Sequence, residues 1–158
     1  IGGGIPLGAI LGRKDFMQAL GPCEHAFSMA GNSEACARGL YNFNLIESKD
    51  FQDNLHKNIE VLQNELNSLK LKYPSVIEKY TGIGLAYGLW VKSISSSEDD
   101  NEACKKIIKR AFDLGLYTMR IGSNWIRIEP MLNLDEKLLK DGMAILDRAV
   151  ADYSEHRI

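Results

Sequence analysis

The sequence has few cysteines, and they form no arrangement that marks a metal or disulfide site. Cys23, Cys36 and Cys104 are odd in number and widely spaced. The sequence contains no Cys-x-x-Cys pair and no cluster of cysteine with histidine. This pattern argues against a disulfide-stabilised scaffold and against a zinc site. We therefore expect no metal and a reducing, cytoplasmic environment.

The chain also lacks an excess of either charge and any long apolar run. Lysine and arginine number 19 against 21 aspartates and glutamates, which gives a net charge of −2. That balance offers no basic surface for nucleic acid and no polybasic patch for a membrane. Apolar runs are only a few residues long, far short of a bilayer span. With 45% hydrophobic and 25% charged residues over 158 positions, the composition is that of a globular protein with a sizeable core.

Glycine, by contrast, is concentrated at the start of the chain. Five of the first twelve residues are glycines, with Ile, Pro, Leu and Ala between them. A flexible linker would be polar, whereas glycines among apolar residues let the backbone pass close to another body. These residues alone leave two interpretations open. One is a tight turn into a buried strand at 5–11, and the other is backbone pressed against a planar ligand or a partner subunit.

The first fifty residues otherwise predict helices and loops. We expect a short helix over 13–20, ended by Gly21-Pro22, and a loop over 23–31. Asn32 or Ser33 is expected to cap a helix that runs to about Glu47.

Beyond residue 47 the hydrophobic periodicity is stronger. A long helix, capped at Ser48 or Asp50 and stopped by Pro74, should face the core with one apolar stripe: Phe51, Leu55, Ile59, Leu62, Leu66 and Leu69. The pattern next predicts, in order, a strand, a helix, two short strands and a final helix, at 81–92, 102–114, 116–120, 125–129 and 135–153. The last helix should turn four residues inward: Leu139, Met143, Leu146 and Val150. This order indicates helices on one face of a small antiparallel or mixed sheet.

A loop with a hydroxyl group leads into the helix expected at residue 33. Ser28 could donate a hydrogen bond to a phosphate oxygen, and the start of a helix favours anions. The plain alternative is a loop serine followed by an N-cap. His25 has a reference pKa suited to acid–base work, but no partner is identifiable from the sequence, so we favour a simple loop histidine.

Arg127 stands in an apolar strand between Ile126 and Ile128. A buried guanidinium needs an anion, and its planar fork suits a carboxylate. The partner could be a substrate carboxylate or an internal aspartate or glutamate, and the residues alone do not decide between them.

Four segments in order resemble class-III pyridoxal-phosphate aminotransferases, a fold-type I family. Residues 1–13 resemble its Gly-Gly-Gly-x-Pro-Leu-Gly-Ala-x-x-Gly-Arg segment, and residues 25–37 resemble its Thr-x-x-Gly-Asn-Pro-x-x-x-Ala loop. Residues 81–85 are similar to its Val-Arg-Gly-x-Gly-Leu segment, and residues 122–132 to its Gly-Asn-x-[Ile/Leu]-Arg-x-x-Pro-Pro-Leu segment. The resemblance extends from residue 1 to about 150.

The resemblance implies roles for two residues. Ser28, in place of the usual Thr, would bind the phosphate of the neighbouring subunit's pyridoxal 5'-phosphate, and Arg127 would bind the substrate α-carboxylate. Ser33 in place of Pro and Met131 in place of the second Pro weaken the match without removing this chemistry. Thr81 stands where an arginine is common, so no role of that arginine is carried over.

The resemblance also implies that the chain is a part of a longer enzyme. The family's Schiff-base lysine would lie about two residues before Ile1, so we expect a C-terminal portion, inactive alone, from a partial sequence or from a chain broken at its modified lysine. Residues 1–47 would end the large cofactor-binding domain, and residues 48–158 would form the small C-terminal α+β domain. The expected fold class is α/β, as a fragment of the pyridoxal-phosphate-dependent transferase fold with helices over a small sheet.

The implied reaction transfers an amino group between an amino acid or amine and a 2-oxo acid, in a homodimer. The loop 27–32 is similar to those of 4-aminobutyrate-type aminotransferases and of amino-acid racemases in the same group. A racemase or epimerase is therefore the alternative enzyme, and a non-catalytic binding module derived from the family is the alternative outside catalysis.

Overall fold

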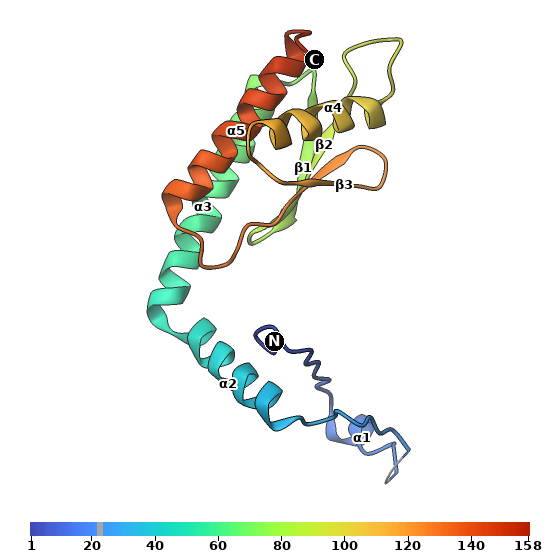
Figure 1. Cartoon of the computed structure of the whole chain (residues 1–158), viewed down its shortest axis with the longest axis vertical. Coiled ribbons are helices and arrows are strands. Elements are labelled where there is room, and N and C mark those ends of the chain that lie inside the picture. Colours follow the sequence, from blue (N-terminus) through green and yellow to red (C-terminus); the bar gives the residue numbers. More distant parts are fainter. Residues whose placement is uncertain (22–23) are drawn as a thin grey trace. The chain divides into compact units, whose positions relative to one another are not determined.

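The computed structural model describes residues 1–21 and 24–158, which divide into two compact units, Ile1–Gln52 and Asp53–Ile158 (Figure 1). The expected helix break at Gly21-Pro22 and the start of the expected loop at Cys23 involve residues 22–23, which lie outside this description. The long helix α3, Lys49–Lys72, contains the boundary between the units.

Helix α2, Ser33–Glu47, is the main element of the first unit, and its start confirms the predicted cap. The Asn32 side chain accepts a hydrogen bond from the Ala35 backbone N–H at 2.9 Å. At the other end, the Ser48 hydroxyl donates to the Leu45 carbonyl at 2.7 Å, so Ser48 closes α2 directly before α3 begins. The predicted helix over 13–20 is shorter than expected, since α1 covers only Lys14–Met17.

The strand predicted over 5–11 is wrong. These residues form no ladder, and most of them are exposed. A strand needs a partner for its N–H and C=O groups, and the described part of residues 1–52 contains no other strand. The segment instead lies along α2, where Leu7 fits over Gly39, at which a Cβ atom would stand 2.7 Å from Leu7 Cδ2. The Asn42 side-chain amide also donates to the Ile1 carbonyl at 2.8 Å.

The second unit contains a four-stranded antiparallel sheet in the order β1-β2-β4-β3. Its strands are β1, Ile77–Ile83; β2, Ala86–Val91; β3, Met119–Ile121; and β4, Trp125–Ile128. The single strand predicted over 81–92 is therefore a hairpin. Gly84, with φ +62°, is the first of the two residues between paired Ile83 and Ala86, where a tight hairpin turn requires a positive φ. The glycine-rich, apolar sequence around this turn concealed it.

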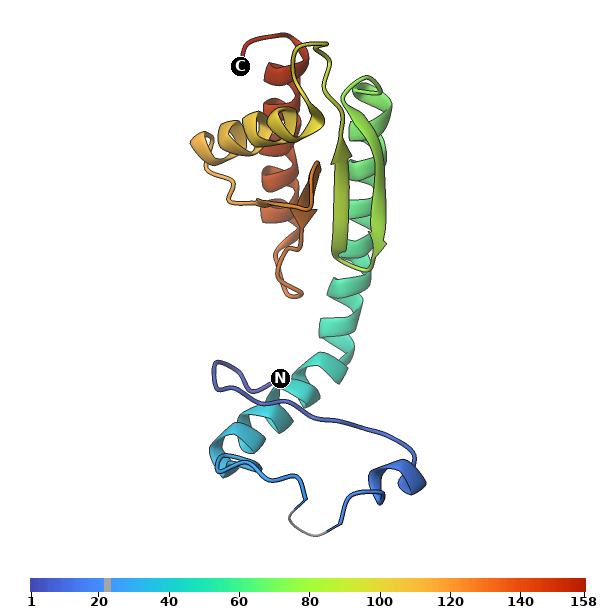
Figure 2. The ribbon, with the colours of Figure 1, turned by 90° about the vertical axis from the view of Figure 1, so that its right-hand side faces the viewer.

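Helices α3, α4 (Asp100–Asp113) and α5 (Glu136–Ser154) share one core with the sheet. Figure 2 shows α3 passing behind the β1–β2 hairpin. The predicted inward residues of the last helix are all buried: Leu139, Met143, Leu146 and Val150. On the sheet, Leu89 and Ile126 are fully buried in the same core, which confirms the prediction of helices over a small antiparallel sheet. Within the described residues, no helix combines the length and apolar character needed to cross a bilayer.

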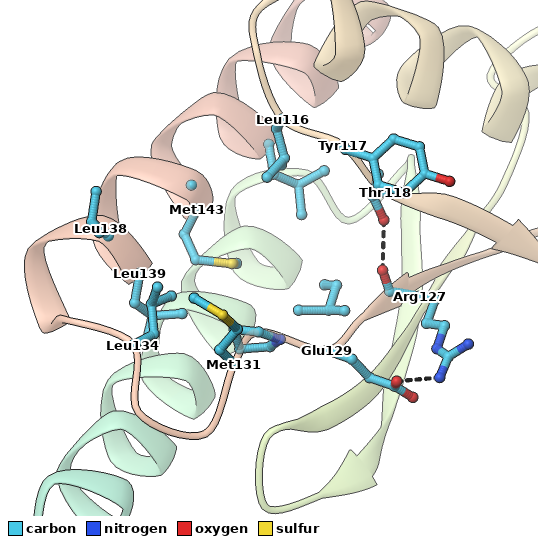
Figure 3. Close-up of a pocket in the computed structure, with 14 residues that line it drawn as sticks. Leu116, Tyr117, Thr118, Arg127, Glu129, Met131, Leu134, Leu138, Leu139 and Met143 are labelled. Atoms are coloured by element: carbon cyan, nitrogen blue, oxygen red, sulfur yellow. Dashed lines mark hydrogen bonds and ion pairs between the residues drawn. The ribbon is translucent and has the colours of Figure 1, made fainter. Parts of the chain in front are cut away.

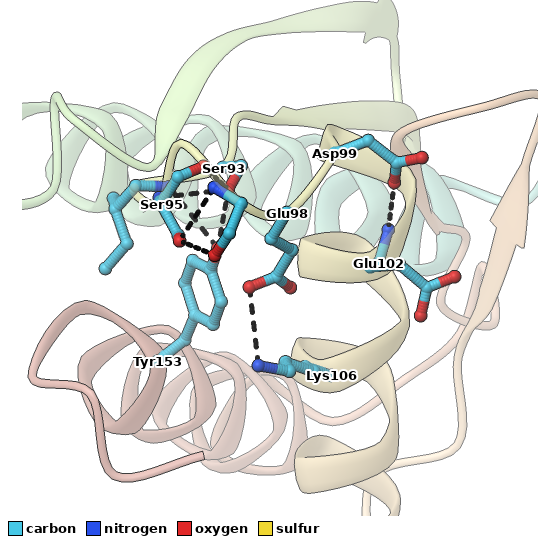
Figure 4. Close-up of polar contacts among 9 residues, drawn as sticks. Ser93, Ser95, Glu98, Asp99, Glu102, Lys106 and Tyr153 are labelled. Atoms are coloured by element: carbon cyan, nitrogen blue, oxygen red, sulfur yellow. Dashed lines mark hydrogen bonds and ion pairs between the residues drawn. The ribbon is translucent and has the colours of Figure 1, made fainter.

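Polar contacts join the loop after β2 to the helices (Figure 4). The Ile94 backbone N–H donates to the Tyr153 hydroxyl at 3.3 Å, and that hydroxyl donates to Ser93 Oγ at 3.4 Å. At the end of the loop, the Asp99 side chain caps α4 by accepting from the Glu102 N–H at 2.8 Å. These bonds attach the loop to both α4 and the end of α5.

One buried carboxylate, Asp152 on α5, pairs with three arginines. It is 2% exposed and accepts from Arg110 of α4 at 2.8 Å, with Arg148 and Arg157 each at 3.1 Å. The hydrogen bond from Arg110 is the main cause that lowers the pKa of Asp152. Asp152 thus joins α4, α5 and the C-terminal residues through a single side chain.

Candidate functional site

The candidate site lies on the face of the sheet opposite the core. Side chains alternate between the two faces of a strand, so Ile126 points into the core and Arg127 points away from it. Across the ladder, Arg127 pairs with Gly88 of β2, and Gly88 pairs with Thr81 of β1. This outer face therefore carries the residue that the sequence proposed for carboxylate binding.

The Arg127 side chain is half-buried and forms an ion pair with Glu129 of the same chain. Its Nη2 donates to Glu129 Oε2, and the two side chains are 40% and 43% exposed. The hydrogen bond that Arg127 donates to Glu129 raises the pKa of Arg127. The expected burial of this guanidinium is wrong, because the flanking Ile126 and Ile128 lie on the other face of the strand. The sequence left two partners open for Arg127, an internal acid or a substrate carboxylate. The structure shows the internal acid, Glu129, and the substrate carboxylate stays a prediction.

A cavity of about 310 Å³ lies beside the C-terminal end of β4. Its wall is mainly apolar and includes Leu116, Leu139 and Met143. Figure 3 shows the Arg127 guanidinium turned toward Glu129 and away from these side chains. At the cavity's edge, the Thr118 hydroxyl donates to the Arg127 carbonyl at 2.6 Å, which fixes the backbone from which the guanidinium projects.

A smaller hollow of about 200 Å³ lies over Gly88 on the outer face. We call it the Gly88 hollow, and its lining residues are Thr81, Ala86, Tyr87, Gly88, Trp90, Trp125 and Glu129. A Cβ atom at position 88 would stand 2.5 Å from Trp125 Cε3, so only glycine lets this indole lie against the strand. Trp125 also stacks on Trp90, with ring centroids 5.9 Å apart and planes 21° apart.

Ser28, the predicted phosphate ligand, is exposed in a turn of the first unit. The Ala30 N–H donates to the Phe27 carbonyl at 3.0 Å, which closes this turn ahead of α2. Among the described residues, the Ser28 hydroxyl has no hydrogen-bond partner, so it is available to a phosphate oxygen. Nearby, the His25 ring packs edge-on against Phe27 at 4.6 Å, as a loop histidine would.

The structure places the two predicted residues in different units. Ser28 belongs to Ile1–Gln52 and Arg127 to Asp53–Ile158. Glu129 was overlooked as a functional residue in the sequence, although a signal was present. Residues two apart on a strand share a face, so an acid at 129 should have been expected beside Arg127.

Sequence comparison matches one family model, described as "Aminotransferase class-III", over residues 1–150. A leucine/methionine racemase of Thermococcus litoralis is 34% identical over 100% of this chain and 36% of the racemase. An acetylornithine aminotransferase of Synechocystis is 32% identical over 96% of the chain and 34% of that enzyme. The chain spans about a third of the length of the curated relatives it matches.

Solved structures show the same fold. The ornithine aminotransferase of Toxoplasma gondii aligns with a TM-score of 0.78 and 20% identity, over 93% of this chain and 33% of that one. The acetylornithine aminotransferase of Elizabethkingia anophelis aligns with a TM-score of 0.75 and 21% identity, over 90% of this chain and 34% of that one. These likenesses support the predicted fold class, a part of an aminotransferase fold.

Proposed function

The chain belongs to the class-III aminotransferase family, and on that premise we propose that it is the C-terminal portion of a pyridoxal-phosphate-dependent transaminase. The enzyme would transfer an amino group between an amino acid or amine and a 2-oxo acid. The family match over residues 1–150 carries this proposal. The homodimer, the cytoplasmic location, the lysine ahead of Ile1 and the inactivity of the chain alone stay predictions.

Pyridoxal phosphate fits the chemistry of the residues that the resemblance assigns to it. When bound, this cofactor supplies the electron sink for a carbanion at the substrate α-carbon. Ser28 would donate its hydroxyl hydrogen to a phosphate oxygen, which is supported by its exposure and by the absence of a partner among the described residues. The turn that carries Ser28 leads into α2, whose first turn favours negative charge.

Arg127 would orient the substrate by binding its α-carboxylate. A guanidinium has five N–H donors, and within residues 1–21 and 24–158 only one of them has a partner, on Glu129. Because that ion pair is partly exposed, it contributes little to stability, so a ligand carboxylate can compete with Glu129 for the fork. The position of Arg127 on a strand anchored in the core by Ile126 holds the fork in place.

A racemase is the second candidate, and one observation favours it. The leucine/methionine racemase matches the whole chain at 34% identity, and the aminotransferases described above match at 32% or below. Racemisation would use the same cofactor and return the proton to the opposite face of the substrate. A requirement for a 2-oxo acid co-substrate indicates transamination, and turnover with the cofactor alone indicates racemisation.

The test of the proposal is Arg127→Lys in the full-length enzyme. Lysine keeps the charge but loses the planar fork, so KM should rise roughly ten-fold for an amino acid with an α-carboxylate. An amine without that carboxylate should be little affected, since it does not use the contact. The matched control is Arg120→Lys on β3, the strand beside β4. Equal losses for both substrates together with a lower melting temperature would show that Arg127 serves only its pair with Glu129.

A further inference from the structure

We propose that the Gly88 hollow receives the side chain of the substrate and selects amino acids with apolar, uncharged side chains. This inference rests on the proposed role of Arg127 in carboxylate binding. It adds the substrate class, which the family match does not provide.

The Gly88 hollow is adjacent to the Arg127 fork. Gly88 is the cross-strand partner of Arg127, so the floor of the hollow and the base of the arginine side chain lie side by side. Glu129 joins them at the other end, because it lines the hollow and also accepts from Arg127 Nη2. A ligand whose carboxylate replaced Glu129 on the fork would have its remaining atoms beside the hollow.

The walls of the Gly88 hollow are suited to carbon and not to charge. The Trp90 Nε1–H already donates to Thr81 Oγ1 at 3.1 Å, so the indole presents carbon atoms to the hollow. The Lys79 ammonium, from the paired position on β1, lies 4.6 Å from the centroid of the Trp90 ring. Among the residues that line the hollow, Glu129 carries the one charge. A charged side chain of either sign would lose its hydration against the two indoles, a cost that an apolar chain does not meet.

The size of the Gly88 hollow matches a medium side chain. Its volume of about 200 Å³ is many times the roughly 10–15 Å³ that a single water needs, so it admits a group of several carbon atoms. The small Ala86 side chain leaves this space open, and the stacked Trp90 and Trp125 bound it, with the Trp125 indole lying on Gly88. An apolar side chain of several carbon atoms fits these limits.

The test measures binding, so that it does not depend on turnover. Acetate, butanoate and 4-methylpentanoate are titrated calorimetrically into the full-length holoenzyme. If the hollow takes the carbon chain, affinity should rise about four-fold for each methylene added. Ala86→Leu fills the hollow from an exposed position at the start of β2 and should flatten this rise. Ala144→Leu, the same change at an exposed position of α5, should leave the rise intact.

Ala86→Val, which adds a smaller side chain to the hollow, allows the same comparison of affinity with chain length if the leucine variant does not fold. Affinity that is independent of chain length in the unchanged enzyme would overturn the inference, as would a rise that persists in both Ala86 variants. Kinetics then separate the inference from the proposed function. If affinity rises with chain length and the Ala86 variants abolish that rise, but the enzyme turns over no amino acid or amine, the transaminase proposal is wrong and the role of the hollow stands. If the enzyme turns over such substrates but carboxylate affinity does not depend on chain length, only the role of the hollow is wrong.

Discussion

Arg127 and Ser28 show what can be inferred about single residues from sequence. Both were selected by motif, and the structure leaves donors of both side chains available to a ligand. The environment of Arg127 was predicted wrongly because neighbouring isoleucines suggested burial, although alternate residues on a strand face opposite ways. The Gly88 hollow was beyond prediction, since it depends on a register that pairs Gly88 with Arg127 and Trp90 with Trp125.

At this scale, Ser28→Ala should weaken cofactor binding in the full-length enzyme. The loss of a hydrogen bond to a charged phosphate should cost about 1.5–3 kcal/mol, while the relative kcat/KM values of different substrates stay similar. Titration of the apoenzyme with pyridoxal phosphate, followed by absorbance, measures the change. Ser33→Ala, in the first turn of α2, is the matched control. Equal cofactor affinity in the two variants would contradict the role of Ser28.

Helices were predicted well and strands less well, for a physical reason. A helix carries its pattern within its own sequence, and the stripe from Phe51 to Leu69 located α3 correctly. A strand is stable only with a partner, which local sequence does not identify. The apolar residues 5–11 therefore predicted a strand that does not form. Most of β1 was not predicted, because its residues Glu78 and Lys79 are polar.

At the scale of elements, Glu136 links α3 and α5 in a pH-dependent way. Its carboxylate contacts Lys140 at 2.6 Å and Lys57 of α3 at 2.7 Å, and these hydrogen bonds, that of Lys140 foremost, lower its pKa from 4.5 to about 2. A carboxyl whose pKa is lower in the folded state stabilises the fold above its unfolded pKa. We expect that contribution to be complete above pH 4.5 and to disappear as the pH falls toward 2.

Glu136→Gln should therefore lower the melting temperature of the chain at pH 7, and the difference from the unchanged chain should shrink between pH 4.5 and 2. Thermal unfolding followed by circular dichroism across this range measures it. Glu102→Gln, at an exposed pair within α4, is the control. A difference that stayed constant with pH would show that Glu136 acts by packing alone.

At the scale of the whole molecule, the two units differ in how much they bury. Residues 53–158 share one core, whereas the buried positions among the described part of residues 1–52 are Gly2, Ala35 and Gly39. Large apolar side chains of α2, such as Leu40, Tyr41 and Phe43, are exposed. The family resemblance likewise implies that residues 1–47 are only the end of a larger domain.

This contrast predicts unequal hydrogen exchange in the 158-residue chain. Amides of β2, β4 and α5 should exchange slowly, and those of α2 should exchange much faster, because few apolar contacts oppose its local opening. Mass spectrometry of the exchanged peptides gives the comparison, and the same α2 peptides in the full-length enzyme are the control. Protection of α2 equal to that of α5 in the chain alone would show that the first unit is stable by itself.

The three arginines around Asp152 have a consequence for how this family can drift in sequence. Loss of Arg110, Arg148 or Arg157 leaves two cations on the carboxylate, so each arginine is individually replaceable. Loss of the carboxylate leaves three cations close together with no counter-charge. Among homologues, substitutions should therefore accumulate at the three arginine positions one at a time, while a change at position 152 should occur only together with the loss of several of them. Asp152 would then record ancestry more faithfully than any of its partners.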